Sequence, residues 1–495
     1  MKKSFILCLT AFLLSSNSFA QPWYITRGTL NSVDVSWGLD VDSAGNIYWA
    51  VEEKNPTPYG FYDINLYKID SNAQEVWHSI PYGESFNDVG FIVKVSGQNV
   101  YVGGRQDSNI FQTLTDPLVL SYDISNGALN WPYLYNTSPD YGYEEIDGLA
   151  IEPDGIYFTG WTQGQGANNM NVIIQKISLT GALDWSTTWD YDSLERHDGA
   201  NGHLVMDDDH IYIAAHVNRT NLLSVDGDGA LVCFNRTDGS YQWETTWGGS
   251  SYDDALGLTI SSDSMLYMVG HTGSYGNGAQ VYLNKYTRNG QLKWSRLWGG
   301  TGAEISRALV TDGDSMLYVA GTTTSYGNGG YDIFVLKYDS SGTLKDSLFW
   351  GGARNDVFHD IVISGDYIYI VGETKNFNGT QSDSTEQALL LKINCRTMQA
   401  PDSAATGIFN TSVFEKKNIE IYPNPFCETT TLEIVKWINQ EYELKIYDLF
   451  GREVRKSKIP NQKSQISKED LPCGMYLFQV NENKQLISSG KLIIQ

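Results

Sequence analysis

Two consecutive units of this chain read Trp247-Gly248-Gly249 … Leu266-Tyr267-Met268-Val269-Gly270 … Val281-Tyr282-Leu283-Asn284-Lys285-Tyr286 and Trp298-Gly299-Gly300 … Leu317-Tyr318-Val319-Ala320-Gly321 … Ile333-Phe334-Val335-Leu336-Lys337-Tyr338. The tyrosine of the middle segment recurs seven times, at intervals of 51 to 56 residues: Tyr48, Tyr101, Tyr157, Tyr212, Tyr267, Tyr318 and Tyr369. Each unit holds four short apolar runs separated by Gly, Asp, Asn and Ser turns, which is the pattern of one propeller blade. The sequence therefore predicts an all-β chain whose main domain is a seven-bladed β-propeller.

The ends of the repeated region indicate how the ring closes. A tryptophan lies in the fourth run of five units: Trp77, Trp131, Trp185, Trp243 and Trp294. The seventh unit stops after its third run, at Asn394, whereas an extra strand-like run, Trp23-Tyr24-Ile25-Thr26, precedes the first unit. We expect this run to supply the missing fourth strand, because that pairing leaves no open sheet edge.

The long loops of the predicted propeller are the first place to look for a ligand site. Tight Asn-Gly, Asp-Gly and Ser-Gly turns join third and fourth strands on one face, and the longer, varied loops between second and third strands share the other. Loops that differ between repeats carry binding chemistry. Their aromatic and amide side chains suit stacking on sugar rings and bonding to hydroxyls, so the predicted ligand-binding residues are Trp161, Tyr275, Asn277, Tyr326 and Asn328.

An alternative interpretation applies to four of these residues. Tyr275 to Gly278 and Tyr326 to Gly329 are two copies of Tyr-Gly-Asn-Gly in neighbouring units. Duplication of a structural turn would leave the same pattern.

An acidic residue precedes each repeat tyrosine by 12 to 14 positions: Asp34, Asp88, Glu145, Asp198, Asp254, Glu304 and Asp356. Two interpretations are open. Seven equivalent carboxylates would form a ring at one mouth of the channel, where they would suit a cation or acid–base work. Alternatively, each carboxylate accepts backbone N–H groups where the chain enters a blade, and the similarity of the seven positions favours this structural role.

The sequence predicts no catalytic residue, no metal site and no cofactor, and hence a protein that is not an enzyme. Histidines show no His-Glu-x-x-His spacing and are interpreted as solvated or turn residues, and no serine stands in Gly-x-Ser-x-Gly. Residues 224–229 and 312–315 have carboxylate spacings seen in calcium loops, but neither continues to the full Ca²⁺ motif. Cys233 and Cys395 lie too far apart around the ring to pair.

The net negative charge of the chain lies in the region predicted to form the propeller. The whole chain carries −24, of which residues 1–20 contribute +2 and residues 415–495 contribute +1, so residues 21–414 hold −27. A field of this sign argues against nucleic acid or an anionic membrane as a partner.

The N-terminus has the pattern of a secretory signal peptide. Lys2 and Lys3 precede the apolar run from Phe5 to Leu14, and small residues lead to a predicted cleavage after Ala20. No later run approaches 18 apolar residues, so no transmembrane segment is expected.

The last part of the chain, 416–495, follows a Ser/Ala/Asp/Thr-rich linker expected at 395–415, and its short alternating strands predict a small Ig-like β-sandwich. It contains Tyr422-Pro423-Asn424-Pro425-Phe426, Tyr447-Asp448-Leu449-Phe450-Gly451-Arg452 and Gly474-Met475-Tyr476-Leu477-Phe478. In these motifs the tail resembles the type A C-terminal sorting domain of the Bacteroidetes type IX secretion system. The motif residues that match are Tyr422, Pro423, Asn424, Pro425, Gly451 and Gly474.

This resemblance implies periplasmic transit, recognition of the tail by the type IX machinery, and release or attachment at the outer-membrane surface. Residues 23–394 more loosely resemble the bacterial β-propeller repeat family, which has no single activity to transfer. We therefore expect a propeller at 21–394 that binds a glycan or a surface protein. The alternatives are a carbohydrate-active enzyme on a propeller scaffold and a structural scaffold of the envelope.

Overall fold

The computed structural model describes residues 22–28, 33–54, 61–83, 86–107, 115–135, 142, 144–163, 171–191, 198–200, 203–218, 227–276, 278–313, 316–375, 386–401, 419–422, 426, 428–434, 442–447, 453–468, 471–472, 474–482 and 485–494. The chain divides into two compact units, Met1–Thr406 and Gly407–Gln495. Within the described residues, no helix has the length and apolar character needed to span a membrane.

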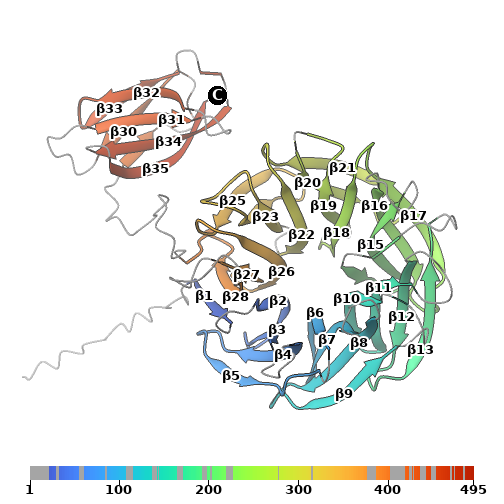
Figure 1. Cartoon of the computed structure of the whole chain (residues 1–495). Helices are drawn as coiled ribbons and strands as arrows, with labels where there is room; N and C mark the ends of the chain where they lie inside the picture. Colours follow the sequence, from blue (N-terminus) through green and yellow to red (C-terminus); the bar gives the residue numbers. More distant parts are fainter. Residues whose placement is uncertain are drawn as a thin grey trace, which may run out of the picture. The chain divides into compact units, whose positions relative to one another are not determined.

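The first unit is a seven-bladed propeller, as predicted (Figure 1). Its described residues form seven four-stranded antiparallel sheets, arranged around a centre that the first strand of each sheet lines. From blade one to blade seven, the inner strands are β2 (Val35–Val41), β6 (Asp88–Ser96), β10 (Glu145–Glu152), β14 (Leu204–Met206), β18 (Asp253–Ile260), β22 (Glu304–Thr311) and β26 (Asp356–Ser364). The second strands are β3 (Ile47–Lys54), β7 (Asn99–Asp107), β11 (Gly155–Thr162), β15 (His210–Asn218), β19 (Leu266–Thr272), β23 (Leu317–Thr323) and β27 (Tyr367–Thr374).

The outer half of each blade completes the sheets. The third strands are β4 (Tyr62–Ile69), β8 (Thr115–Asp123), β12 (Asn171–Ile177), β16 (Gly227–Asn235), β20 (Gln280–Tyr286), β24 (Asp332–Tyr338) and β28 (Gln387–Asn394). The fourth strands are β5 (Glu75–His78), β9 (Leu129–Leu134), β13 (Leu183–Trp189), β17 (Tyr241–Trp247), β21 (Leu292–Trp298), β25 (Leu344–Trp350) and β1 (Trp23–Arg27).

The closure predicted from the sequence is confirmed. Strand β1 pairs antiparallel with β28, with Trp23 opposite Lys392 and Arg27 opposite Ala388. The Trp23 ring lies 6.3 Å from the ring of Tyr369, the repeat tyrosine of blade seven. The N-terminal run therefore supplies both the strand and the tryptophan that the seventh repeat lacks.

The recurring tyrosine and tryptophan are explained by packing between blades. Each repeat tyrosine is buried, and in six blades its ring lies near the tryptophan of the fourth strand, for example 5.9 Å between Tyr267 and Trp294; blade six has Asp346 in place of that tryptophan. Trp294 packs on a turn of the next blade: a Cβ built on Gly342, whose φ is +79°, would lie 3.0 Å from the Trp294 ring. Only glycine fits such a turn, so the repeated Gly and Trp hold neighbouring blades in contact.

The repeated lysine of the third strand has a similar role. Lys285 extends across the Tyr267 ring, 5.1 Å from its centroid, and donates to the Ser340 carbonyl of the next blade at 3.1 Å. Lys68, Lys337 and Lys392 make the equivalent bond to their following blade. The cores are accordingly shared between blades: one cluster joins Val269 and Leu283 of blade five to Leu317 and Phe334 of blade six.

The residues from 395 to 401, expected to begin the linker, lie on the propeller instead. Cys395 and Met398 are buried in the core beside blade seven, and Gln399 bonds back to Asn394. The side chain of Trp350 donates to the carbonyl of Pro401 at 3.1 Å. These contacts extend the first unit beyond its last strand. Cys233 and Cys395 are both buried and unpaired.

The second unit is a two-sheet β-structure, as the sequence predicts. One sheet has the order β29-β30-β33 and the other the order β32-β31-β34-β35. The strands are β29 (Ile419–Tyr422), β30 (Thr429–Ile434), β31 (Tyr442–Tyr447), β32 (Glu453–Ile459), β33 (Lys463–Ser467), β34 (Gly474–Glu482) and β35 (Gln485–Ile494). Leu432 and Ile466 of the first sheet share one core with Ile446 and Val480 of the second.

Candidate functional site

The acidic residues that precede the repeat tyrosines are structural. Glu304 is fully buried and accepts the Gly300 N–H at 2.9 Å and the Thr323 hydroxyl at 3.1 Å. Asp356 accepts the Gly352 N–H at 2.8 Å in the same way. These carboxylates therefore fix the chain where it enters blades six and seven, as the second of the two interpretations holds.

In two blades the sequence interpretation selected the wrong acid. Glu144, rather than Glu145, accepts the Thr162 hydroxyl at 2.6 Å, and Asp253, rather than Asp254, accepts the Gly249 N–H at 2.7 Å. The alternation of the strand places the neighbouring residues, Glu145 and Asp254, on the opposite side, where they line the channel.

One of these buried acids is held in its protonated form. Asp88 lies in a buried group with Asp63 and Asp107 at the junction of blades one and two. Burial and then the charges of Asp63 and Asp107 raise the pKa of Asp88 to about 8, although the Gln106 side chain acts in the opposite direction. Because the pKa of Asp88 is higher in the folded than in the unfolded chain, the contribution of Asp88 to the free energy of unfolding is most favourable in acid. It falls as the pH rises from about 4 toward 8.

Asp88→Asn should therefore raise the melting temperature at pH 8, where we expect a gain of about 2 kcal/mol or more in the free energy of unfolding. The gain should vanish near pH 4, because the unfolded chain is then protonated as well. Thermal unfolding followed by circular dichroism across this pH range measures the difference. Asp356→Asn is the control: it places an amide against the Gly352 N–H and should lower the melting temperature at every pH. An equal effect of Asp88→Asn at all pH values would contradict the assignment.

A β-bulge follows the structural acid in six of the seven inner strands. Each bulge adds one unpaired residue, three positions after the acid, and re-aims its side chain toward the axis. The six residues, which we call the bulge ring, are Trp37, Phe91, Asp147, Leu256, Arg307 and His359. The fourth blade's equivalent lies outside the described residues. Glycines after the bulge allow close approach of the inner strands, since a Cβ on Gly38 would lie 2.6 Å from the Phe91 carbonyl.

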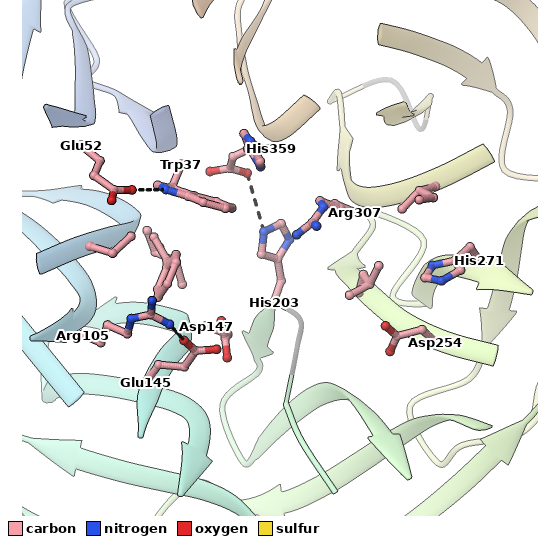
Figure 2. A pocket seen from close by; sticks show the side chains of 16 residues that line it. Trp37, Glu52, Arg105, Glu145, Asp147, His203, Asp254, His271, Arg307 and His359 are labelled. Atoms are coloured by element: carbon pink, nitrogen blue, oxygen red, sulfur yellow. Dashed lines mark hydrogen bonds and ion pairs between the residues drawn. The ribbon is translucent and has the colours of Figure 1, made fainter. Parts of the chain in front are cut away.

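The bulge ring lines a central pocket of about 640 Å³ (Figure 2). The pocket is completed by Glu52, Val89, Ile92, Arg105, Glu145, His203, Asp254, His271, Ile305 and Asp360. These side chains come from the beginnings of inner strands and the ends of second strands. The pocket therefore opens on the face from which the long second-to-third loops leave, the face predicted to carry the ligand site.

One side of the central pocket is aromatic. The Trp37 ring lies 4.1 Å from the ring of His359 and 5.4 Å from that of Phe91, so blades seven, one and two form a continuous aromatic arc. The Trp37 indole N–H donates to Glu52 Oε2 at 3.0 Å, which fixes the ring plane (Figure 2).

The neighbouring wall, on blades two and three, holds an ion pair beside a second carboxyl group. Arg105 contacts Glu145 at 2.9 Å (Figure 2). It also contacts Asp107 at 3.4 Å. Burial and then the charge of Glu145 raise the pKa of Asp147 well above its usual range. The two acids therefore differ: Glu145 is ion-paired with Arg105, whereas burial disfavours the charged form of Asp147 and raises its pKa.

Three histidines of the pocket are neutral near physiological pH. Burial lowers the pKa of His203 to about 4, and the nearby charge of Lys94 adds to this. Burial also lowers the pKa values of His271 and His359, and the charge of Arg307 contributes to both. His203 Nε2 lies 3.7 Å from Asp360. The interpretation of His203 as a solvated or turn residue is wrong, because it is held in the channel wall.

The ligand-binding residues predicted from the loops lie on different blades. Trp161, at the end of β11, covers Gly199 in the next blade, 2.6 Å from a Cβ built there. Tyr275 is 40% exposed, and its hydroxyl donates to the Gly248 carbonyl at 2.8 Å. Asn277 lies outside the described residues.

The Tyr-Gly-Asn-Gly loop of blade six, residues 326–329, makes contacts similar to those of the same loop in blade five. The Tyr326 hydroxyl donates to the Gly299 carbonyl at 3.2 Å, and the Asn328 side chain donates to the Gly351 carbonyl at 3.2 Å. Such bonds are those a structural turn requires. The Tyr326 ring also stacks against Trp298 and Phe349, at 5.1 and 5.2 Å, and those two rings lie 6.1 Å apart.

The sorting motif is only partly described. Tyr422 is exposed at the end of β29, where its hydroxyl contacts Glu433 and Lys463. Gly474 begins β34, opposite Ile494. Ala20, Pro423, Asn424, Pro425 and Gly451 lie outside the described residues. Among the residues that the structure describes, no three His, Cys, Asp or Glu side chains are placed to share a metal ion.

Two family models match the chain. Residues 420–495 match the secretion system C-terminal sorting domain, and residues 169–405 match the family of the outer membrane protein assembly factor BamB. The tail is therefore a type IX sorting domain, and the protein is secreted or attached at the cell surface. No curated protein matches the sequence.

Several solved structures are similar in fold. A catalytically inactive virginiamycin B lyase from Staphylococcus aureus is 11% identical, with a TM-score of 0.46 over 75% of this chain and 99% of that chain. PorZ, a surface component of the type IX secretion system of Porphyromonas gingivalis, is 10% identical, with a TM-score of 0.41 over 92% of this chain and 59% of that chain. Quinohemoprotein alcohol dehydrogenase from Comamonas testosteroni is 10% identical, with a TM-score of 0.44 over 77% of each chain. At such identities no activity is transferred.

Proposed function

We propose that this type IX-sorted surface protein is a glycan-binding propeller whose ligand occupies the central pocket. One observation carries the proposal: six blades each aim a different side chain into one cavity from the same bulge position. A scaffold that keeps one bulge position in each blade and varies the side chain there is suited to ligand selection.

The chemistry of the pocket supports a sugar. The aromatic arc of His359, Trp37 and Phe91 offers ring faces to the C–H groups of a pyranose, and the opposite acids and bases offer donors and acceptors to its hydroxyls. The volume of about 640 Å³ lies within the range of small-molecule sites.

Trp37→Ala should weaken glycan binding by about 1–3 kcal/mol, because it removes the central ring of the arc. Trp37→Phe should restore part of the affinity. The ligand is first identified on a glycan array with the mature chain, and its Kd is then measured by calorimetry. Leu344→Ala, at an exposed position of the outer strand β25, is the control for general effects of truncation.

Tyr275→Ala and Tyr326→Ala separate this pocket from the loop site predicted from the sequence. If the ligand lies in the central pocket, both variants lower the melting temperature and leave the Kd unchanged. Loss of binding at constant melting temperature would instead place the site in the loops. If the chain binds no glycan on the array but captures a purified surface protein, the ligand is a protein rather than a glycan.

A second candidate function is favoured by the acids of blade three. Glu145 is ion-paired with Arg105, whereas burial and the charge of Glu145 raise the pKa of Asp147, and such different environments are what an acid–base pair requires. The corresponding function is a carbohydrate-active enzyme. Release of reducing ends or unsaturated products from the array ligand, abolished by Asp147→Asn, would establish it; an unchanged ligand after prolonged incubation would exclude it.

A further inference from the structure

Arg307 differs from Arg105, the other arginine of the central pocket. It is the bulge residue of β22, and its side chain is exposed in the channel (Figure 2). Within the part of the chain that the structure describes, Arg307 makes no ion pair and no hydrogen bond. An arginine aimed into a cavity without a partner has its five N–H donors available for a ligand.

Arg105 provides the internal comparison. Its guanidinium contacts Glu145 at 2.9 Å and Asp107 at 3.4 Å, and lies 5.6 Å from the centroid of the Phe91 ring. Arg105 is therefore ion-paired within the protein, whereas Arg307 is not ion-paired in the described residues.

We propose that Arg307 binds the carboxylate of an acidic sugar, a uronic acid unit, while the aromatic arc stacks on its ring; this inference rests on the proposed glycan-binding function. The planar guanidinium matches a carboxylate through two parallel hydrogen bonds, which a neutral hydroxyl does not provide. Burial and then the charge of Glu145 raise the pKa of Asp147, which disfavours its charged form as a partner of Arg307, although the charges of Arg105 and Arg307 act in the opposite direction.

The surroundings of Arg307 fit the same ligand. His271 Nδ1 and both ring nitrogens of His359 are buried and have no hydrogen-bond partner in the described structure. Neutral imidazoles provide one donor and one acceptor each, which suits the hydroxyls flanking a sugar carboxylate. The propeller as a whole is strongly acidic, so long-range attraction does not bring an anion here, and recognition has to come from short contacts within the pocket.

The test compares one oligosaccharide in two forms, with its uronic acid intact and with the carboxyl group reduced to the alcohol. The mature full-length chain should bind the acidic form about 10- to 100-fold more tightly. Arg307→Gln should remove this preference and leave binding of the reduced form nearly unchanged. Arg307→Lys, which keeps the charge but loses the planar fork, should restore part of it.

Matched controls distinguish the outcomes. Arg396→Gln removes one positive charge from an exposed arginine outside the pocket and should not alter the preference. Since Arg307 has no partner in the described structure, its variants should melt as the wild type does. An unchanged preference in Arg307→Gln, or tighter binding of a sulfated than of a carboxylated sugar, would overturn the inference and leave glycan binding standing. Failure to bind either form would overturn the proposed function itself.

Discussion

Deletion of residues 416–495 should abolish display at the cell surface and leave the propeller in the periplasm. The deleted segment is the type IX sorting domain, and the remaining chain retains all seven blades, the closing strand and every inter-blade core. Because each unit has its own hydrophobic core, loss of the tail removes the sorting signal without unfolding the propeller. Cell fractionation and protease accessibility on intact cells, each followed by immunoblotting, measure the redistribution.

The full-length chain expressed from the same promoter is the control for this deletion. A purified propeller with an unchanged melting temperature would show that misfolding is not the cause of retention. Normal surface exposure of the truncated chain would show that export depends on a different part of the protein.

Deletion of residues 22–27 should destabilise the propeller by more than about 3 kcal/mol, the loss expected for a single buried tryptophan. The deletion removes the whole β1 register against β28 and the Trp23 ring beside Tyr369. It also removes the bond from the Trp23 indole N–H to the Ser71 carbonyl, which joins blade seven to blade one. Thermal unfolding measures the loss, and light scattering detects association through the exposed β28 edge.

Trp131→Ala is the matched control for the closure, since it removes a fourth-strand tryptophan from blade two without opening the ring. The strand deletion should cost more than this substitution. A smaller cost, with no association, would mean that the ring is held closed mainly by packing between the inner strands.

The repeat made the fold readable from the sequence. A period of about 50 residues defines the blades, and the count of fourth-strand tryptophans identifies Trp23 as the closing one. The period does not select between adjacent acids, which is why Glu145 and Asp254 were assigned the role of Glu144 and Asp253. Both pairs fall within the drift of the repeat, and only the hydrogen bonds distinguish their members.

The central pocket was missed because a bulge interrupts the two-residue alternation on which strand predictions depend. Trp37 and His359 come from opposite ends of the chain, and no local pattern brings them to 4.1 Å. The residue three positions after each structural acid is different in each of the six described blades, but neighbouring repeat positions and the loops vary as well, so the sequence pattern alone does not mark this position.

Because of the bulges, the ligand specificity of the propeller can change while its fold stays the same. A bulge residue is not paired with a residue of the neighbouring strand. Its replacement therefore leaves the strand hydrogen bonds and the inter-blade cores in place. Gene duplication can therefore copy a blade whole, and a single codon per blade can then drift without loss of the ring. Related surface proteins of one bacterium would acquire new specificities by this route while sharing one architecture and one export pathway.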